Sequence, residues 1–374
     1  MRFSSRAIVA FFVMAVFLMI SLQSYASTVS SKQIRVDFIC DLNDGNPFWD
    51  KYISFMNESA KDLGIKLTVY KTYGNSYALK ELMVSRINST TKPNAIVFYN
   101  VKEQGSILIK IAERYKMPVF LLNSSLSAGE RASMGSPRQK YKYWIGEMTP
   151  DDTGAGYLVA DELLSGLSKN KQYHIIAFKG PSGYDYASDS RVNGLKLAVK
   201  KHPNVVIDQI VPAYWQTPLA QNKFKMLKSQ RYKNATIAWT ASDGMAIGVA
   251  NACKQLGLKP GKDIKIGGVD WVDDVFPYVK RKEINVTVGG HFVEGAWVMV
   301  LLNDYFKGKD FASESTIMKT HMAPITAKNY SSYQSLLNQK NWTKINFKKF
   351  SKVYNPSVKK YNFNLSELQK ATAQ

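Results

Sequence analysis

The sequence predicts an α/β protein of two doubly wound lobes, each built on a parallel sheet. Short apolar segments of strand length alternate with amphipathic segments of helix length over most of the chain. This alternation is interrupted once, at 123–141, and then starts again. Because alternating strands and helices form parallel sheets with helices on both faces, the two series predict two lobes. The space between their strand ends is a common position for a small-molecule site.

The first series begins with a strand at 34–41 and a helix at 47–63. Asn46 can cap this helix, and Pro47 suits its first turn because a proline has no N–H group to leave unbonded. Further strands are expected at 65–69, 95–98 and 119–122, and further helices at 79–87 and 106–115.

The interruption at 123–141 contains Ser, Gly and Pro and is predicted to be a loop. We expect the second series to begin with a strand near 143–145 and a helix starting around 149–152, with acids in its first turn. Further strands are expected at 173–178, 205–211, 235–240, 264–268 and 284–288. Helices are expected at 188–201, 219–229, 243–256, 272–281 and 292–306, the last of them amphipathic, and the pattern weakens after 316.

The N-terminus has the pattern of a signal peptide at 1–26. Arg2 and Arg6 precede an apolar run at 7–20, and Ser-Tyr-Ala at 24–26 is a small-x-small cleavage site. Cleavage after Ala26 would export the chain and start the mature protein at Ser27. An uncleaved membrane anchor is the alternative, although the apolar run is short for a membrane span.

Composition and motifs exclude several classes of protein. The formal net charge of +21 would suit a nucleic-acid binder, but the export signal and the lack of DNA- or RNA-binding motifs argue against one. We find no metalloprotease motif, P-loop or dinucleotide-binding glycine motif, and the four histidines lack metal-ligand spacing. We therefore expect no enzyme, no cofactor and no metal. Cys40 and Cys253 are expected to be separate buried thiols and not a disulfide.

The C-terminal part of the chain is strongly basic. One acid, Glu367, stands against nine lysines, which are Lys328, Lys340, Lys344, Lys348, Lys349, Lys352, Lys359, Lys360 and Lys370. This segment is either a solvated basic tail or a surface that meets acidic lipid or an acidic partner.

Phe48 and Trp49 stand where the first strand passes into the first helix. Ligands of open α/β sheets bind at this edge. The two rings could equally belong to the core, so the pattern alone leaves both interpretations open.

Five motifs, taken in order, resemble the periplasmic binding proteins of the ribose-binding type, over about 34–322. They are Asn-Pro-Phe-Trp at 46–49, Lys-Gly-Pro-Ser-Gly at 179–183, Arg-Val-Asn-Gly at 191–194, Thr-Ala-Ser-Asp-Gly-Met-Ala-Ile-Gly at 240–248 and Gly-Gly-Val-Asp at 267–270. The resemblance implies type 1 solute-binding architecture, with three hinge crossings and closure around a ligand, a motion known for this family. It implies an N-terminal lobe at 34–147 plus 291–321 and a C-terminal lobe at 148–290. The basic extension at 322–374 would close on the hinge.

The resemblance also implies the site residues. A sugar-like ligand offers apolar faces to aromatic rings and a rim of hydroxyls to charged and amide side chains. The implied ligand-binding residues are Asn46, Phe48, Trp49, Asn100, Asn123, Arg191, Trp215, Ser242 and Asp270, with Ser124, Asp243 and His291 as further candidates. The alternatives are a core role for the two rings, Tyr214 in place of Trp215, a surface position for Arg191, a turn-forming role for Asp270, a helix cap at Asp243 and a structural role for His291.

Two departures from the family pattern narrow the range of expected ligands. Asn123 and Ser124 stand where simple sugar binders carry Asp-Arg, and Gly290 stands where they carry glutamine. Ribose itself is therefore not expected, and Asn123, Arg191 and the Ser242-Asp243 pair are partly similar to the furanosyl-signal receptor of quorum sensing. We expect a monomeric periplasmic protein that delivers a small sugar-like or furanosyl ligand to an ABC-type importer. The alternative is a sensory subunit acting through a membrane histidine kinase or chemoreceptor.

Overall fold

Residues 33–373 are described by the computed structural model, and they contain two six-stranded sheets. The first sheet consists, in spatial order, of β11 (Ile317–Thr320), β5 (Trp144–Pro150), β4 (Val119–Leu122), β3 (Ala95–Phe98), β1 (Arg35–Cys40) and β2 (Lys66–Lys71). The second consists of β12 (Ala323–Ile325), β10 (Val286–Gly289), β9 (Lys265–Asp270), β8 (Ile237–Thr240), β6 (Tyr173–Lys179) and β7 (Val205–Pro212). The pairs are parallel apart from β10 with β12, so the predicted fold class is confirmed.

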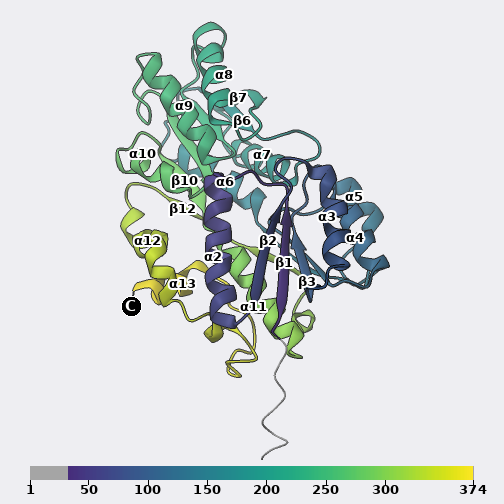
Figure 1. Ribbon diagram of the computed structural model, residues 1–374. Helices are drawn as coiled ribbons and strands as arrows, with labels where there is room; N and C mark the ends of the chain where they lie inside the picture. Colours follow the sequence, from purple (N-terminus) through teal and green to yellow (C-terminus); the bar gives the residue numbers. More distant parts are fainter. Residues whose placement is uncertain (1–32, 374) are drawn as a thin grey trace, which may run out of the picture. The chain divides into compact units, whose positions relative to one another are not determined.

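Helices cover both faces of these sheets. The α-helices of the first part are α2 (Pro47–Leu63), α3 (Leu79–Ile87), α4 (Gly105–Arg114) and α5 (Ala128–Met134). They are followed by α6 (Asp152–Leu164), α7 (Tyr186–Val199), α8 (Thr217–Gln230), α9 (Asp243–Gln255), α10 (Phe276–Lys280), α11 (Glu294–Phe306), α12 (Tyr330–Leu337) and α13 (Leu365–Ala373). In Figure 1, α3, α4 and α5 lie on one side of the first sheet and α2 lies on the other. Between 33 and 373 no helix is both long and apolar enough to cross a membrane.

The chain passes between the two sheets three times. It leaves the first sheet after Pro150, returns after Gly289 through the short helix His291–Val293, and crosses again between Thr320 and Ala323. The carboxyl ends of the parallel strands in both halves lie next to these passages. The exact limits of the two lobes stay a prediction.

The α2 N-terminus is formed as its sequence predicts. Asn46 caps α2, because its side-chain oxygen accepts a hydrogen bond from the Trp49 N–H at 3.2 Å. Pro47 occupies the first turn and Gly64 ends the helix with a φ of 71°.

The cysteine prediction is also confirmed, since Cys40 and Cys253 are both buried free thiols.

Three expectations about elements were wrong. The region 123–141 is not a continuous loop but contains α5, whose start is fixed by a capping box between Ser127 and Glu130. The strand expected to open the second series is β5, which pairs with β4 and β11 in the first sheet. The helix expected to be amphipathic, α11, is buried at every position from Glu294 to Asp304, because α2, strands β4 and β5 and the C-terminal 3-10 helix Phe347–Phe350 all pack on it.

The C-terminal segment is not a solvated tail. After β12 it folds as α12, the 3-10 helices Gln339–Lys344 and Phe347–Phe350, and α13. Leu336, Trp342, Phe347 and Leu368 are buried, so apolar side chains anchor the segment. Its lysines remain on the outside for the most part.

Candidate functional site

Arg191, on α7, lies at the centre of a buried polar cluster. Its Nε donates to Asp152 Oδ1 at 2.8 Å, and its Nη1 donates to the Ala241 carbonyl at 2.7 Å and to Asp270 Oδ1 at 3.0 Å. The side chain is 5% exposed. A surface position for Arg191 is therefore wrong, and the guanidinium is fixed in one orientation by three acceptors.

The two carboxylates come from different elements. Asp152 stands in the first turn of α6, and Asp270 ends β9 with a φ of 131°. Burial raises the pKa of Asp152 to about 6, although the Arg191 guanidinium opposes this shift. Burial likewise raises the pKa of Asp270, against the same guanidinium. Asp152 Oδ2 has no hydrogen-bond partner among the described residues, so this buried oxygen is free to accept one.

His291 brings the crossing between the halves into the cluster. Its ring stacks on Phe48 of α2, with 4.6 Å between centroids, and its Nε2 lies 3.4 Å from Arg191 Nη2. Burial, and then the charge of Arg191, lower the pKa of His291 well below its ordinary value. The imidazole is therefore neutral, accepts at Nε2, and carries its proton on Nδ1, for which residues 33–373 offer no acceptor.

The aromatic candidates lie around this cluster. Trp49 packs on Tyr99 with 4.6 Å between ring centroids, and both Trp49 and Phe48 are only partly buried. The centre of the Trp215 ring lies 5.7 Å from the Arg191 guanidinium, and Trp215 Nε1 donates to Asp185 Oδ2 at 3.0 Å. The neighbouring Tyr214 is 48% exposed. Trp215, and not Tyr214, is thus the ring that faces Arg191.

Three of the candidate residues have a positive φ. Asn123, Trp215 and Asp270 have φ values of 60°, 64° and 131°, a region that side-chain-bearing residues rarely adopt. Gly180 leaves the room that the Trp215 ring occupies, since a Cβ at this position would lie 2.2 Å from the ring. Strained residues of this kind gather at functional sites, which supports the strand ends as the site.

Several other candidates already have partners within their own half. The Asn100 amide nitrogen donates to the Ser125 carbonyl and to Glu130, while its oxygen accepts from the Gly105 N–H. The Ser124 carbonyl accepts from the Asn100 N–H. These bonds hold the start of α4 against α5, and the structure does not bring Asn100 into the Arg191 cluster.

Ser242 caps the helix α9, and Asp243 has a structural role inside the protein. Ser242 caps α9 by accepting from the Met245 N–H, so the expectation that Asp243 caps the helix was wrong. Asp243 is fully buried and accepts from Thr287 Oγ1 at 2.7 and 2.9 Å and from the Val272 N–H at 3.2 Å. Its bonds fix the turn after β9, next to Asp270.

Sequence reasoning missed two buried carboxyl groups. Asp152 was interpreted only as a helix-start acid, which is the ordinary meaning of an acid in a first turn. Glu294, at the start of α11, is fully buried, and hydrogen bonds from Thr320 and Asn123 reach it. Burial raises the pKa of Glu294 well above its ordinary value. The sequence did contain a signal for Glu294, because a charged residue at the start of an otherwise apolar helix indicates a buried polar group.

The site offers many acceptors and no metal-binding set. Within the part of the chain that the structure describes, no group of three His, Cys, Asp or Glu side chains could hold a metal ion. Asp152, Asp270 and Glu294 outnumber the single guanidinium, and His291 is neutral. The arrangement can therefore accept hydrogen bonds from hydroxyl groups and present ring faces.

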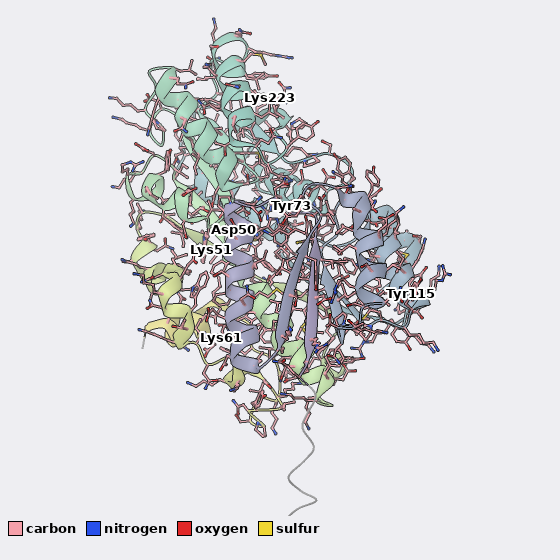
Figure 2. The ribbon with its side chains drawn as sticks, in the orientation of Figure 1. Asp50, Lys51, Lys61, Tyr73, Tyr115 and Lys223 are labelled. Carbon is pink, nitrogen blue, oxygen red and sulfur yellow. The ribbon has the colours of Figure 1, made fainter. Side chains whose placement is uncertain are left out.

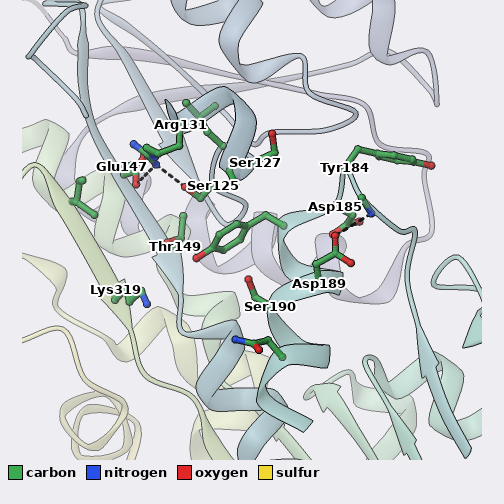
Figure 3. A pocket seen from close by; sticks show the side chains of 16 residues that line it. Ser125, Ser127, Arg131, Glu147, Thr149, Tyr184, Asp185, Asp189, Ser190 and Lys319 are labelled. Atoms are coloured by element: carbon green, nitrogen blue, oxygen red, sulfur yellow. Dashed lines mark hydrogen bonds and ion pairs between the residues drawn. The ribbon is translucent and has the colours of Figure 1, made fainter. Parts of the chain in front are cut away.

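A cavity of about 580 Å³ has a lining that includes no residue of the Arg191 cluster, and Figure 3 shows the side chains that line it. One wall comes from the segment after β4 and from β5 and β11, and the other from the segment that leads into α7. None of the predicted ligand residues lines it, although Ser125 and Ser190 are chain neighbours of Ser124 and Arg191.

The family model of the periplasmic binding protein domain matches residues 38–310. The chain belongs to this family. Its members are binding proteins of the periplasm and not enzymes, so the predictions of fold family, of compartment and of no catalytic role are confirmed. The predicted cleavage site after Ala26 lies outside the described residues.

Curated relatives are similar to parts of this periplasmic binding protein. It is 27% identical to the galactofuranose-binding protein YtfQ of Escherichia coli (strain K12) over 183 residues, 48% of this chain and 54% of that protein. The match thus spans about half of that relative. It is 23% identical to the D-allose-binding periplasmic protein of the same organism over 243 residues, 65% of this chain and 75% of that protein.

Among solved structures, a periplasmic sugar-binding protein from Pseudomonas fluorescens superimposes with a TM-score of 0.79 at 26% identity. The alignment covers 89% of this chain and 99% of that chain.

Proposed function

We propose that this protein captures a small, neutral, sugar-like or furanosyl ligand between its two halves and delivers it to an ABC-type importer of the inner membrane. The observation that carries the proposal is the fixed guanidinium of Arg191. It lies 5.7 Å from the centre of the Trp215 ring and 3.4 Å from His291 Nε2, and the His291 ring at the crossing stacks on Phe48 of the other half. The names of the relatives, binders of galactofuranose and D-allose, support a sugar as the ligand.

The charges of the site support a ligand without negative charge. Asp152 and Glu294 each keep a buried oxygen without a partner, and an approaching hydroxyl can donate to it. An anionic ligand would stand next to the carboxyl groups of Asp152 and Asp270, and the single guanidinium is already bonded to both of them, so it is not available to balance a further negative charge. We therefore propose neutral sugars and not sugar phosphates or sugar acids.

Export, with cleavage after Ala26, and a monomeric state belong to the same proposal. No observation favours the sensory alternative. It predicts that a null mutant still imports the ligand but loses the transcriptional response to it, whereas the proposed function predicts lost import.

The direct test is binding by the mature protein starting at Ser27. A thermal-shift screen against D-allose, D-galactose, L-arabinose and methyl galactofuranoside should find a stabilising sugar, since ligand at 100 times its Kd adds about 2.7 kcal/mol. Trp215→Ala should then reduce the affinity for that sugar, measured by calorimetry, by about tenfold or more, because a ring face and its contact with Arg191 are lost.

Tyr214→Ala is the matched control, since it removes the exposed neighbouring ring. It should leave the affinity near that of the wild type. Equal losses in both variants would contradict the assignment of Trp215, and a protein that no sugar stabilises would contradict the proposed function.

A further inference from the structure

The cavity beside Arg191 has a wall of free polar groups along one face of α7. Tyr186, Asp189, Ser190 and Asn193 recur at helical spacing and all line the cavity. Asp189 pairs with Lys179 and accepts from the Gly183 N–H. The side chains of Tyr186, Ser190 and Asn193 have no hydrogen-bond partner among residues 33–373, so they can both donate and accept.

Hydrogen bonds hold the side chains of the opposite wall in place. Arg131 of α5 donates to both carboxylate oxygens of Glu147 at 2.7 Å and to the Ser125 hydroxyl at 2.7 Å (Figure 3). The capping box at Ser127 fixes the start of α5, and Thr149 adds a hydroxyl from β5. The charges of Arg131 and Glu147 compensate each other, and Lys319 of β11 adds one further cation to a wall that otherwise offers hydroxyls.

The cavity is physically connected to the proposed sugar site. Asp185 lines the cavity, caps α7 through the Ser188 N–H at 3.0 Å, and accepts the Trp215 indole N–H at 3.0 Å. Ser190 precedes Arg191 on the same helix, and Thr149 lies near the end of β5, three residues before Asp152. The lining of the cavity and the Arg191 cluster are therefore direct neighbours in the chain and are joined by the bond between Asp185 and Trp215.

We propose that the cavity is a second subsite, which holds a neutral hydroxyl-rich unit joined to the ring at Arg191, so that the ligand has at least two sugar rings. The inference rests on the proposed function and specifies its ligand class. A volume of about 580 Å³ exceeds what a few waters need and falls in the ordinary range of small-molecule pockets, about 300–1,000 Å³. The lining combines hydroxyl and amide groups with apolar surface from Leu126, Tyr184 and Ile317, and its charged groups are of both signs. Such a mixture suits the hydroxyls and apolar C–H faces of a glycosidic unit.

The test compares one-ring and two-ring sugars by calorimetry on the mature protein. The probe pairs are methyl galactofuranoside with the corresponding galactofuranosyl disaccharide, and D-galactose with lactose. In at least one pair the two-ring sugar should bind about tenfold tighter, as expected from two or three additional hydrogen bonds.

Asn193→Phe fills the cavity from an exposed position of α7. This variant should reduce the affinity for the two-ring sugar by about tenfold or more and change the affinity for the one-ring sugar by less than about twofold. Lys196→Phe is the control, because it places the same side chain on the same helix at an exposed position that does not line the cavity.

Three outcomes would overturn the inference. If one-ring sugars bind and two-ring sugars bind no better, the second subsite is wrong while the proposed function stands. If Asn193→Phe weakens both classes equally, the cavity is the principal site and not a second one. If neither class binds, the proposed function fails and this inference fails with it.

Discussion

Asp243 shows how strongly single residues of this site depend on burial. Its carboxyl is completely covered, and its partners are the Thr287 hydroxyl and the Val272 N–H. Burial, and then the negative charge of Asp270, raise its pKa from 3.8 to about 8. Neutral donors do not compensate a buried charge as a guanidinium does, so the folded protein favours the protonated form.

This shift predicts a pH-dependent stability with a definite sign. Between about pH 4 and about pH 8 the folded chain holds a proton on Asp243 that the unfolded chain has released. The free energy of unfolding therefore falls as the pH rises through this window. Asp243→Asn keeps one acceptor oxygen and removes the titration, so urea denaturation at several pH values should give a flatter profile. The matched control is Asp161→Asn on the exposed face of α6, which should reproduce the wild-type slope.

The sequence predicted the residue types of the site better than their individual roles. Arg191, Asp270, Trp215, His291 and Phe48 come together in the structure, because motifs at strand ends converge on one edge of a parallel sheet. Asn100 and Ser242 instead bond to nearby backbone. Short polar side chains have such local partners available at every helix start, and their choice depends on the final backbone path.

At the scale of elements, α2 and α11 pack closely next to the site. Gly295 of α11 lies against Tyr52 and Met56 of α2, and an added Cβ would stand 2.7 Å from the Tyr52 ring. The missing side chain lets the two helices approach. Their N-terminal ends carry Phe48 and Glu294, so this approach also sets the spacing of site residues.

A pair of glycine substitutions tests this packing. Gly295→Ala should destabilise the protein by about 1–3 kcal/mol, the usual cost of overpacking a core. Gly129→Ala, on α5, adds the same methyl group where nothing lies within 4 Å of it. That variant should be neutral or more stable by about 0.5–1 kcal/mol through helix propensity. Chemical denaturation of both variants measures the difference, and equal effects would show that the helix contact is not tight.

Most elements could be predicted because periodicity and helix caps are local signals. The helix α5 was missed because it has only seven residues and little apolar periodicity. Its capping box also lies among Ser and Gly residues, which are equally typical of a loop. The assignment of β5 to the first sheet was missed for another reason. Strand pairing is a long-range choice that periodicity does not encode.

At the scale of the whole described region, Lys51 and the C-terminal segment connect the two halves. Lys51 of α2 is buried, and its Nζ donates to the Trp271 carbonyl at 3.0 Å and to Asp273 at 2.6 Å. Asp273 also accepts from Gln339 of the C-terminal segment. Tyr333 packs on Trp271 of the second half, while Trp342 packs on Phe55 of α2.

These contacts limit how far the halves can separate. Lys51→Met keeps the apolar stem and removes the bonds to Trp271 and Asp273, and Asp273 is 54% exposed, so it is not left as a buried charge. Small-angle scattering of the ligand-free protein should therefore give a larger radius of gyration for this variant. Lys61→Met, at the other end of the same helix (Figure 2), is the control. An unchanged radius for Lys51→Met would show that this contact does not restrain the halves.

The sequence by itself determined the fold class, the order of most strands and helices, and the kinds of side chain at the strand ends, because each of these follows from local periodicity and short motifs. Only the tertiary structure decided what surrounds Phe48 and Trp49. It placed His291 and Tyr99 against them, Asp152 against Arg191, and a second cavity next to the cluster. Burial, pKa and empty volume arise from contacts between residues far apart in the chain, and no local pattern contains them.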